Sequence, residues 1–418
     1  MLPLDLDGVV DLEGYIPDLR NWFRSEWKGL MGTPPGRGRG LLMGAPIWGQ
    51  EFIDRFFFFS LPSILSAKNL AVLQEHGCRI VIFTEDQENR DYIERFWLMK
   101  KALAIRGIDV QIKELPAHIM RQVPDKPLNK YWLLGTVQNL MVQMAAHDGM
   151  AFHMLMPDHL YSDEYFPNLF RLAKDHEGIA QTSISADIHK CLPELEQWRQ
   201  PDGSLAAPAV ELGDLGWKHL HQQTRYNIMN DVDITSKLPN SHFQCWQGKD
   251  RLYLFCCHMN AVYLSANVCK QAPIRLHNAL DTELPAFMPK EVLVPEVEDG
   301  MAFLELSDDT KTHGVDRVSF PEFAYQCWNT VHFREDWMAF YETPVTVPIR
   351  PQETYLEEDE IMRRQRSIVA ALMAAKPGIQ ALVQKQREEL KARKDAAQAQ
   401  ASATAAAIAE CIEQVAAD

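Results

Sequence analysis

Residues 151–163, AFHMLMPDHLYSD, form a short apolar run followed by two aspartates. Six of the first seven residues are apolar or proline, which is typical of a strand buried on both faces of a sheet. Asp158 lies at the carboxyl end of such a strand. Open α/β sheets bind their ligands at the edge formed by these strand ends. A carboxylate in that place can hold a divalent cation, and the cation can hold a diphosphate.

Apolar runs and helical stretches alternate around this motif. Runs of strand character lie at residues 41–45, 79–84, 108–112, 152–156 and 179–184. Helical stretches separate them, at about residues 52–76, 85–107, 130–146 and 165–174. This order is the signature of right-handed βαβ units. We therefore expect an α/β fold with a Rossmann-type, mainly parallel sheet flanked by helices.

The second half of the chain has a different pattern. Helices are expected at about residues 192–198 and 210–230, and a β-hairpin at residues 241–257. Its second strand lies in the apolar segment RLYLFCCHMNAVYL, and residues 270–350 look irregular. The last 60 residues predict a long helix with one break, at Pro377. We divide the chain at 1–38 (an irregular N-terminal segment), 39–187 (an α/β half), 188–350 (an α+β second half) and 351–418 (a helical C-terminal extension).

Composition narrows the class of protein. The 418 residues are 46% hydrophobic and 24% charged, as in soluble globular proteins. The net charge of −15 argues against a nucleic-acid binder, which needs a basic face. The eight cysteines lack a CxxC pair, so we expect reduced core residues of a cytoplasmic protein rather than a zinc site. The sequence contains neither an obvious signal peptide nor a clear transmembrane segment.

The two aspartates of the motif are the first candidates for chemistry. Asp158 is a candidate metal ligand and catalytic residue; the structural alternative is that it closes a turn after Pro157. Asp163 is a candidate second carboxylate, or an acceptor for a sugar hydroxyl. For Asp163, capping of the helix that begins next to it is the favoured alternative.

Residues after the first two strands are candidates for nucleotide binding. Pro46 fixes the chain as it leaves the first strand, and Trp48 offers a flat ring that could stack on a base or simply close the core. Thr84 and Glu85 end the second strand and could read a base or ribose; equally, Thr84 could cap the next helix. Since neither GxGxxG nor GxxxxGK[ST] is present at these turns, dinucleotide-binding and P-loop functions lose their main support.

Three candidates come from the second half. His258 ends an apolar strand and is either a metal or diphosphate ligand or a core histidine. Asp281 and Glu283 could place a general base near an acceptor. The pairs His219/His221 and Asp231/Asp233 are expected to be surface residues, because an i, i+2 spacing on a helix does not converge on one ion.

The chain resembles GT-A-type nucleotide-diphospho-sugar transferases of a bacterial type. The resemblance rests on LLMGAPIWGQEF, FFFFSLPSILSAKNLAVL, RIVIFTED, MLMPDHLYSD and LYLFCCHMNAVYL, in that order, over roughly residues 40–310. It implies a GT-A-like domain in which residues 39–187 bind the nucleotide-sugar and residues 188–350 form the acceptor side. Pro46, Trp48, Thr84 and Glu85 would then surround the base and ribose. Asp158 would stand for the metal-side aspartate of a DxD motif, and His258 for a late histidine at the metal or diphosphate.

One departure from that motif bears on the metal. A DxD pair would need an acid at position 156, and Met156 cannot bind a hard cation through oxygen. A divalent cation, Mn²⁺ or Mg²⁺, therefore stays an open expectation. Asp158 with Asp163 would hold it, or His258 and backbone amides would bind the phosphates unaided.

The resemblance implies glycosyl transfer from a nucleotide-diphosphate donor to a carbohydrate, lipid-linked or protein acceptor. One alternative is a non-catalytic GT-A-like scaffold that binds partners through its C-terminal helix. Another is a different α/β enzyme acting on a nucleotide or phosphate ester. Residues 352–418 are further expected to allow self-association or binding of a protein partner.

Overall fold

The computed structural model describes residues 18–36, 38, 40–85, 90–125, 129–231, 238–239, 243–256, 259–272, 292–311, 317–329 and 338–417. A six-stranded sheet of order β3-β2-β1-β4-β11-β6 forms its centre. The strands are β1 (Leu41–Pro46), β2 (Cys78–Glu85), β3 (Asp109–Leu115), β4 (Ala151–Met154), β6 (Gly178–Gln181) and β11 (Ala261–Leu264). Strands β1 to β4 are parallel, and β11 lies antiparallel between β4 and β6. The expected mainly parallel α/β sheet is confirmed.

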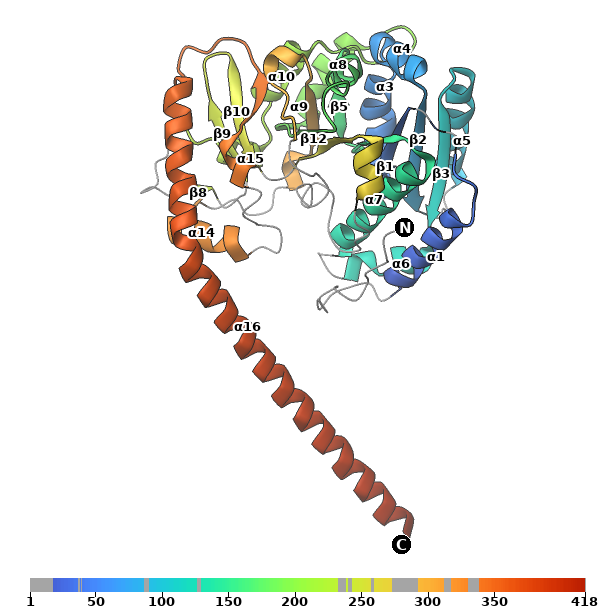
Figure 1. Ribbon diagram of the computed structural model, residues 1–418, viewed down its shortest axis with the longest axis vertical. Helices are drawn as coiled ribbons and strands as arrows, with labels where there is room; N and C mark the ends of the chain where they lie inside the picture. The colour runs from blue at the N-terminus through green and yellow to red at the C-terminus, as the bar shows by residue number, and fades with distance from the viewer. Residues whose placement is uncertain are drawn as a thin grey trace.

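Helices bury both faces of this sheet, which explains the unbroken apolar character of its strands. Every residue of β1 is buried. One face packs against α1 (Leu19–Met31), α7 (Asn129–Asp148) and α12 (Ala266–Gln271). The other face packs against α2 (Gln50–Arg55), the π-helical turn η1 (Phe56–Ser60), α3 (Leu61–Ile64), α4 (Ala67–His76), α5 (Arg90–Ile105) and α8 (Tyr165–Leu172). The sheet is therefore the middle layer of three (Figure 1).

Two helical predictions in this half need correction. The single helix expected at residues 52–76 is divided into α2, η1, α3 and α4. Pro62 lies in the first turn of α3, where proline fits a helix start and cannot donate to the preceding turn. The N-terminal segment expected to be irregular contains α1, whose Trp22 and Phe23 are buried in the core.

The apolar segment at residues 251–264 was predicted to be one strand, and this is wrong. Strand β10 (Arg251–Cys256) pairs with β9 (Phe243–Gln247) and β14 (Val345–Pro348), whereas β11 crosses into the main sheet. The hairpin itself is confirmed. Pairing of β11 with β4 means that the second half of the chain completes the central sheet.

A second sheet of order β5-β12-β7 lies beside the central one. It contains β5 (His159–Tyr161), β7 (Ser185–Asp187) and β12 (Phe303–Ser307), with α9 (Ile188–Leu195), α10 (Ala209–Lys218) and α11 (Gln222–Tyr226) nearby. The expected helix at 210–230 is thus two helices. The remaining short elements are α6 (Ala117–Met120), η2 (Val123–Asp125), η3 (Glu196–Trp198), η4 (Val297–Asp299), η5 (Asp309–Lys311) and the bridge of β8 (Leu238–Pro239) to β13 (Arg317–Val318).

The C-terminal helix α16 (Glu358–Ala417) is partly docked and partly projecting (Figure 1). Its first turns bury Ile361, Ile368 and Leu372 against α14 (Phe320–Asn329), α15 (Met338–Glu342) and β10. Pro377 lies inside the helix, so the predicted break is wrong. Figure 1 instead shows α16 bending where it leaves the body, as proline-containing helices do.

By length and composition alone, the Glu358–Gln386 part of α16 could cross a membrane. This finding is marginal, because the same segment supplies the buried residues of the docked turns. Cys78, Cys191, Cys245, Cys256, Cys269 and Cys327 are buried, in agreement with the core positions expected for cysteines.

Gly213 lets α10 approach β14 closely, and its substitution tests this packing. A Cβ at Gly213 would lie 1.8 Å from the Pro348 carbonyl oxygen, so the backbones would have to separate. We expect Gly213→Ala to lower the free energy of unfolding by about 1–3 kcal/mol, measured by urea denaturation. Gly29→Ala is the matched control, because a Cβ at Gly29 meets no atom within 4 Å. Equal stability of the two variants would contradict the close contact.

Candidate functional site

Asp158 lies at the carboxyl edge of the central sheet, in the turn between β4 and β5. The backbone N–H of Leu306 donates to the Asp158 carbonyl oxygen at 2.9 Å. Strand β12 thereby places Glu305 opposite His159 on one side and Ser185 on the other. Two carboxylates that are far apart in the sequence, Asp158 and Glu305, become neighbours at this edge.

The electrostatics of Asp158 are unusual for a surface aspartate. Its side chain keeps partial exposure, but its Oδ1 is buried and has no hydrogen-bond partner within the described part of the chain. Burial, followed by repulsion from the Glu305 carboxylate, raises the pKa of Asp158 to about 7, against the opposing attraction of Arg55. Asp158 therefore changes charge near neutral pH, a property common among functional carboxylates.

Arg55 brings a positive charge to this carboxylate pair from α2. It is 7% exposed, and its Nη1 donates to the Leu306 carbonyl oxygen at 2.9 Å. Glu51, one turn earlier, pairs with the same guanidinium. The guanidinium is thus fixed at the end of β12, close enough to Asp158 to affect its pKa.

Glu305 was not among the residues that we expected from the sequence. Its carboxylate accepts hydrogen bonds from Asn260 Nδ2 at 3.3 Å and from Ser307 Oγ at 3.1 Å. It also lines a hollow with residues of β7, of α11 and of the turn between β6 and β7. The alternation in FLELS, residues 303–307, is the sequence signal that could have identified this strand.

His159 follows Asp158 but is not placed to exchange protons. It is 1% exposed among the rings of Tyr161 and Phe303. Burial lowers the pKa of His159 to about 3, so its imidazole stays neutral at physiological pH. Among the described residues at this edge, the carboxylates of Asp158 and Glu305 are therefore better suited to acid–base chemistry than His159.

The residues predicted to bind a nucleotide lie where β1 and β2 end. Pro46 is the last residue of β1 and is in register with Phe83 of β2. Gly49, just after Trp48, donates its N–H to Glu85 Oε1 at 3.1 Å, which ties the two strand ends together. Leu155 donates to the Gly44 carbonyl oxygen at 2.8 Å, so the end of β4 lies beside the end of β1.

Thr84 and Trp48 differ in their environments. Thr84 is 2% exposed, and its Oγ1 finds no partner among the described residues. Thr84 and Glu85 line a small hollow with Trp97 and Lys100 of α5. Because Thr84 lies inside β2, it is not the N-cap of α5. Trp48 is partly buried against the core, as its structural alternative predicted. Nucleotide binding by these residues stays a prediction.

The structure does not bring Asp163 to Asp158. Strand β5 (His159–Tyr161) lies between them, so Asp158 precedes the strand and Asp163 follows it. Asp163 instead pairs with Lys68 at 3.4 Å. It does not cap α8 either, because the N-cap position belongs to Glu164. Both interpretations of Asp163, as a partner of Asp158 and as a helix cap, therefore need correction.

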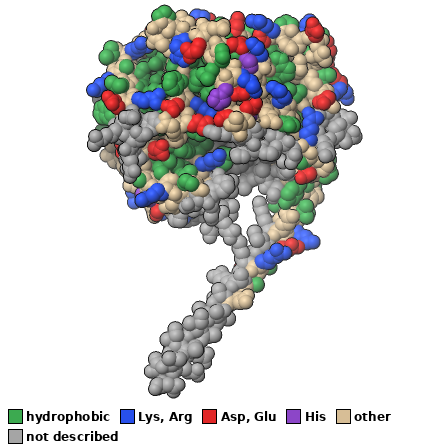
Figure 2. All heavy atoms as spheres, turned by 180° about the vertical axis from the view of Figure 1, so that it is seen from behind, with side chains coloured by type: hydrophobic (Ala, Val, Ile, Leu, Met, Phe, Trp, Pro, Cys, Tyr) green, Lys and Arg blue, Asp and Glu red, His purple; other side chains and the backbone are tan. Residues whose placement is uncertain are grey.

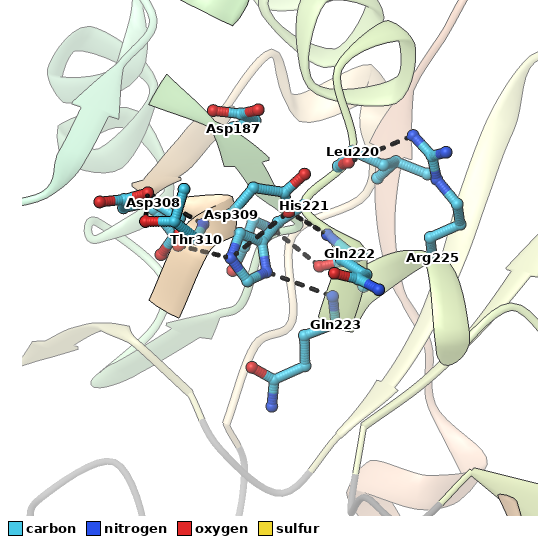
Figure 3. Close-up of polar contacts among 12 residues, drawn as sticks. Asp187, Leu220, His221, Gln222, Gln223, Arg225, Asp308, Asp309 and Thr310 are labelled. Atoms are coloured by element: carbon cyan, nitrogen blue, oxygen red, sulfur yellow. Dashed lines mark hydrogen bonds and ion pairs between the residues drawn. The ribbon is translucent and has the colours of Figure 1, made fainter. Parts of the chain in front are cut away.

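Three other candidates, His258, Asp281 and Glu283, lie outside the described residues. The expectation that His219 and His221 are surface residues is wrong for His221, which is 5% exposed. His221 Nδ1 accepts from the Gln223 N–H at 3.2 Å, and its Nε2 lies 3.2 Å from the Asp308 carbonyl oxygen (Figure 3). These partners select the tautomer protonated at Nε2.

The carboxylates of Asp158 and Glu305 supply some, but not all, of the oxygen ligands that a hard cation needs. Among the described residues, no group of three or more His, Cys, Asp or Glu side chains converges on one point. Asp158 Oδ1 is nevertheless a buried acceptor without a partner in that part of the chain, and Glu305 adds a second carboxylate. One or two carboxylates are what Mg²⁺ takes from protein when phosphate oxygens complete its shell.

No protein-family model matches the chain. A segment of 139 residues, 33% of the chain, is 30% identical to a tRNA (guanine-N(1)-)-methyltransferase from Mycolicibacterium paratuberculosis (strain ATCC BAA-968 / K-10). The chain spans about half the length of that curated relative, 52%. A match of this extent does not assign the chain to a family.

Solved structures with a similar arrangement include S. aureus TarS 1–349, with a TM-score of 0.31 and 9% identity over 80% of this chain and 70% of that one. Mouse xyloside xylosyltransferase 1 in its apo form has a TM-score of 0.23 and 12% identity over 38% of this chain and 57% of that one. Similarity at this level carries no argument about function, which has to come from the site.

Substitution of Asp158 by asparagine should stabilise the fold at high pH. The folded state keeps the Asp158 proton up to pH 7, whereas the unfolded chain releases it near the ordinary value of 3.8, so wild type loses stability as pH rises between these values. A neutral amide avoids that loss, which is on the order of 1–2 kcal/mol for a partly exposed group.

The measurement is urea unfolding of wild type and Asp158→Asn at pH 4.5 and pH 8. We expect the advantage of the variant to be larger at pH 8. Asp163→Asn is the matched control, because the Asp163 carboxylate has an ion-pair partner in Lys68. An advantage that is the same at both pH values would show that the pKa of Asp158 is not raised.

Proposed function

We propose that this protein transfers a sugar from a nucleotide-diphosphate donor to an acceptor hydroxyl. The observation that carries the proposal is Asp158 Oδ1, a carboxylate oxygen that is buried without a hydrogen-bond partner among the described residues, at the carboxyl edge of a mainly parallel sheet. Open α/β sheets bind ligands at this edge, and the ends of β1, β2 and β4 meet there. An acid kept unpaired at such an edge is available to a ligand.

In this proposal the nucleotide lies over the ends of β1 and β2, near Trp48, Thr84 and Glu85. Arg55 supplies fixed positive charge for the departing diphosphate. If a divalent cation is used, Asp158 would hold it together with oxygens of the diphosphate, and it would add charge stabilisation there.

The acceptor side lies toward Glu305, which faces the neighbouring hollow. The acceptor oxygen forms a bond to the anomeric carbon while the bond from that carbon to the diphosphate oxygen breaks. The hydroxyl proton passes to the Glu305 carboxylate, and the nucleoside diphosphate leaves with the bonding electron pair.

Methyl transfer to tRNA is a second candidate, favoured by the partial match to a methyltransferase. Charge argues against it, since the chain has a net charge of −15 and RNA binding needs a basic face. On the face shown in Figure 2, Lys and Arg side chains are interspersed with Asp and Glu. A methyl donor is therefore included in the test below.

The first test is thermal stabilisation by ligands. A sugar nucleotide present at a hundredfold excess over its dissociation constant should stabilise the protein by about 2.7 kcal/mol. We expect UDP- or GDP-sugars, with or without Mn²⁺, to raise the melting temperature of wild type by several degrees. Asp158→Asn should lose most of this shift, and Asp163→Asn should keep it because Asp163 lies at the other end of β5.

Two outcomes would contradict the proposal. The first is a panel of sugar nucleotides that leaves the melting temperature of wild type unchanged, which would favour the non-catalytic scaffold. The second is stabilisation by S-adenosylmethionine alone, which would favour methyl transfer.

We further propose that the projecting part of α16 mediates self-association. A single helix gains little stability in water without tertiary packing, and the docked turns end near Ile379. A chain that ends at Gln386 should keep its melting temperature, because the turns buried against α14 and α15 remain. Light scattering should show a smaller assembly than that of the full chain, and an unchanged assembly state would exclude this role.

A further inference from the structure

A polar hollow of about 270 Å³ is lined by Glu305 and by the segments that follow β6 and precede β11. It lies between the edge of the central sheet and the end of the β9–β10 hairpin. All but two of its lining residues carry hydrogen-bonding groups of the hydroxyl, amide or carboxylate type, and these are Thr182, Ser183, Ser185, Gln223, Thr224, Asn227, Asn260 and Glu305. The remaining two are Phe243 and Cys256.

Asn227 shows that the polar lining is not saturated by the protein itself. It is 3% exposed, and its Oδ1 accepts no hydrogen bond from any described residue. A buried amide oxygen without a partner costs folding free energy that a ligand donor can recover. Since Asn227 is one of the lining residues, the wall of the hollow contains an acceptor that the described residues do not satisfy.

Helix α11, which contains Gln223 and Thr224, and its C-cap residue Asn227 form one wall of the hollow, and polar contacts fix the position of the helix (Figure 3). Asp309 Oδ1 accepts from the Gln222 N–H at 2.6 Å. His221 joins the start of α11 to the Asp308 carbonyl, and Thr224 Oγ1 accepts from the Ser185 N–H at 3.3 Å. The end of β12 thus positions both Glu305 and the wall opposite it.

The chemistry of the lining selects a class of ligand. Hydroxyl and amide groups both donate and accept, which suits a neutral molecule with several hydroxyls. Among the described residues that line the hollow none is Lys or Arg, so an anionic group would have no counter-charge and would meet the Glu305 carboxylate. The ring of Phe243 adds one flat apolar surface, as in sites that combine aromatic contact with a few oriented polar groups.

We propose that this hollow is the acceptor subsite and that it takes a neutral saccharide, rather than a phosphorylated or lipid acceptor. The inference rests on the proposed function only in calling the saccharide the acceptor. Gln223 and Asn227 are its recognition residues, and Glu305 faces the hydroxyl that reacts.

The experiment measures saccharide binding by the full chain without donor. Methyl β-D-glucopyranoside, methyl β-D-galactopyranoside, methyl α-D-mannopyranoside and cellobiose are titrated and followed by NMR, with glycerol 3-phosphate as the anionic comparison. We expect at least one saccharide to bind, and glycerol 3-phosphate to bind more weakly than that saccharide. Loss of one hydrogen bond through Gln223→Ala should weaken binding about threefold to tenfold.

Gln222→Ala is the matched control, because Gln222 is the same residue type on the same helix but does not line the hollow. Asn227→Leu should also weaken binding, provided that its melting curve shows a folded protein. Gln223 is exposed, so Gln223→Ala keeps the test decisive if Asn227→Leu does not fold.

The inference fails if no saccharide binds, if binding is unaffected by Gln223→Ala, or if glycerol 3-phosphate binds better. Its failure is distinguishable from failure of the proposed function. If sugar nucleotides stabilise the protein but no saccharide binds, only the assignment of the hollow as the acceptor subsite is wrong. If saccharide binding depends on Gln223 but sugar nucleotides have no effect, the saccharide site is supported and the proposed transfer reaction is not.

Discussion

Pairing of β12 with both β5 and β7 is the constraint on which the site depends. The hydrogen bond from Leu306 to the Asp158 carbonyl places Glu305 beside Asp158 although 146 residues separate them in the sequence. The residues that follow β12, Asp308 and Asp309, hold α11 in place. One strand thus positions the carboxylate pair, the Arg55 contact at the Leu306 carbonyl and the wall of the hollow.

Local pattern was sufficient to predict the parallel part of the sheet. Strands β1, β2 and β4 are buried on both faces, and their apolar runs are bounded by helices of matching period. Their carboxyl ends meet at one edge because parallel strands share a direction, so the place of Asp158 followed from the topology alone. The link between Gly49 and Glu85 shows the same convergence for β1 and β2.

The sequence did not reveal which strands pair when they are far apart in the chain. The segment at residues 251–264 is largely apolar, yet its two halves belong to different sheets, because β10 pairs with β9 and β14 whereas β11 pairs with β4 and β6. Glu305 lies on a strand whose partners are 118 or more residues away, and no local signal specifies such a register. The role of α11 depends equally on contacts with β12.

Asp158 lowers the stability of the fold but is available for chemistry, because its Oδ1 has no hydrogen-bond partner among the described residues. A buried acid without a partner lowers stability, and asparagine at the same position would avoid the cost of its charge. Conflicts of this kind between local stability and chemistry are expected at functional sites. Asp163, of the same type and only five residues away, also has an Oδ1 without a partner among the described residues, but its Oδ2 lies 3.4 Å from Lys68 Nζ. Asp158 instead lies beside a second carboxylate, Glu305, at the edge of the sheet. This difference argues that the edge at Asp158, rather than the segment as a whole, is built to receive a ligand.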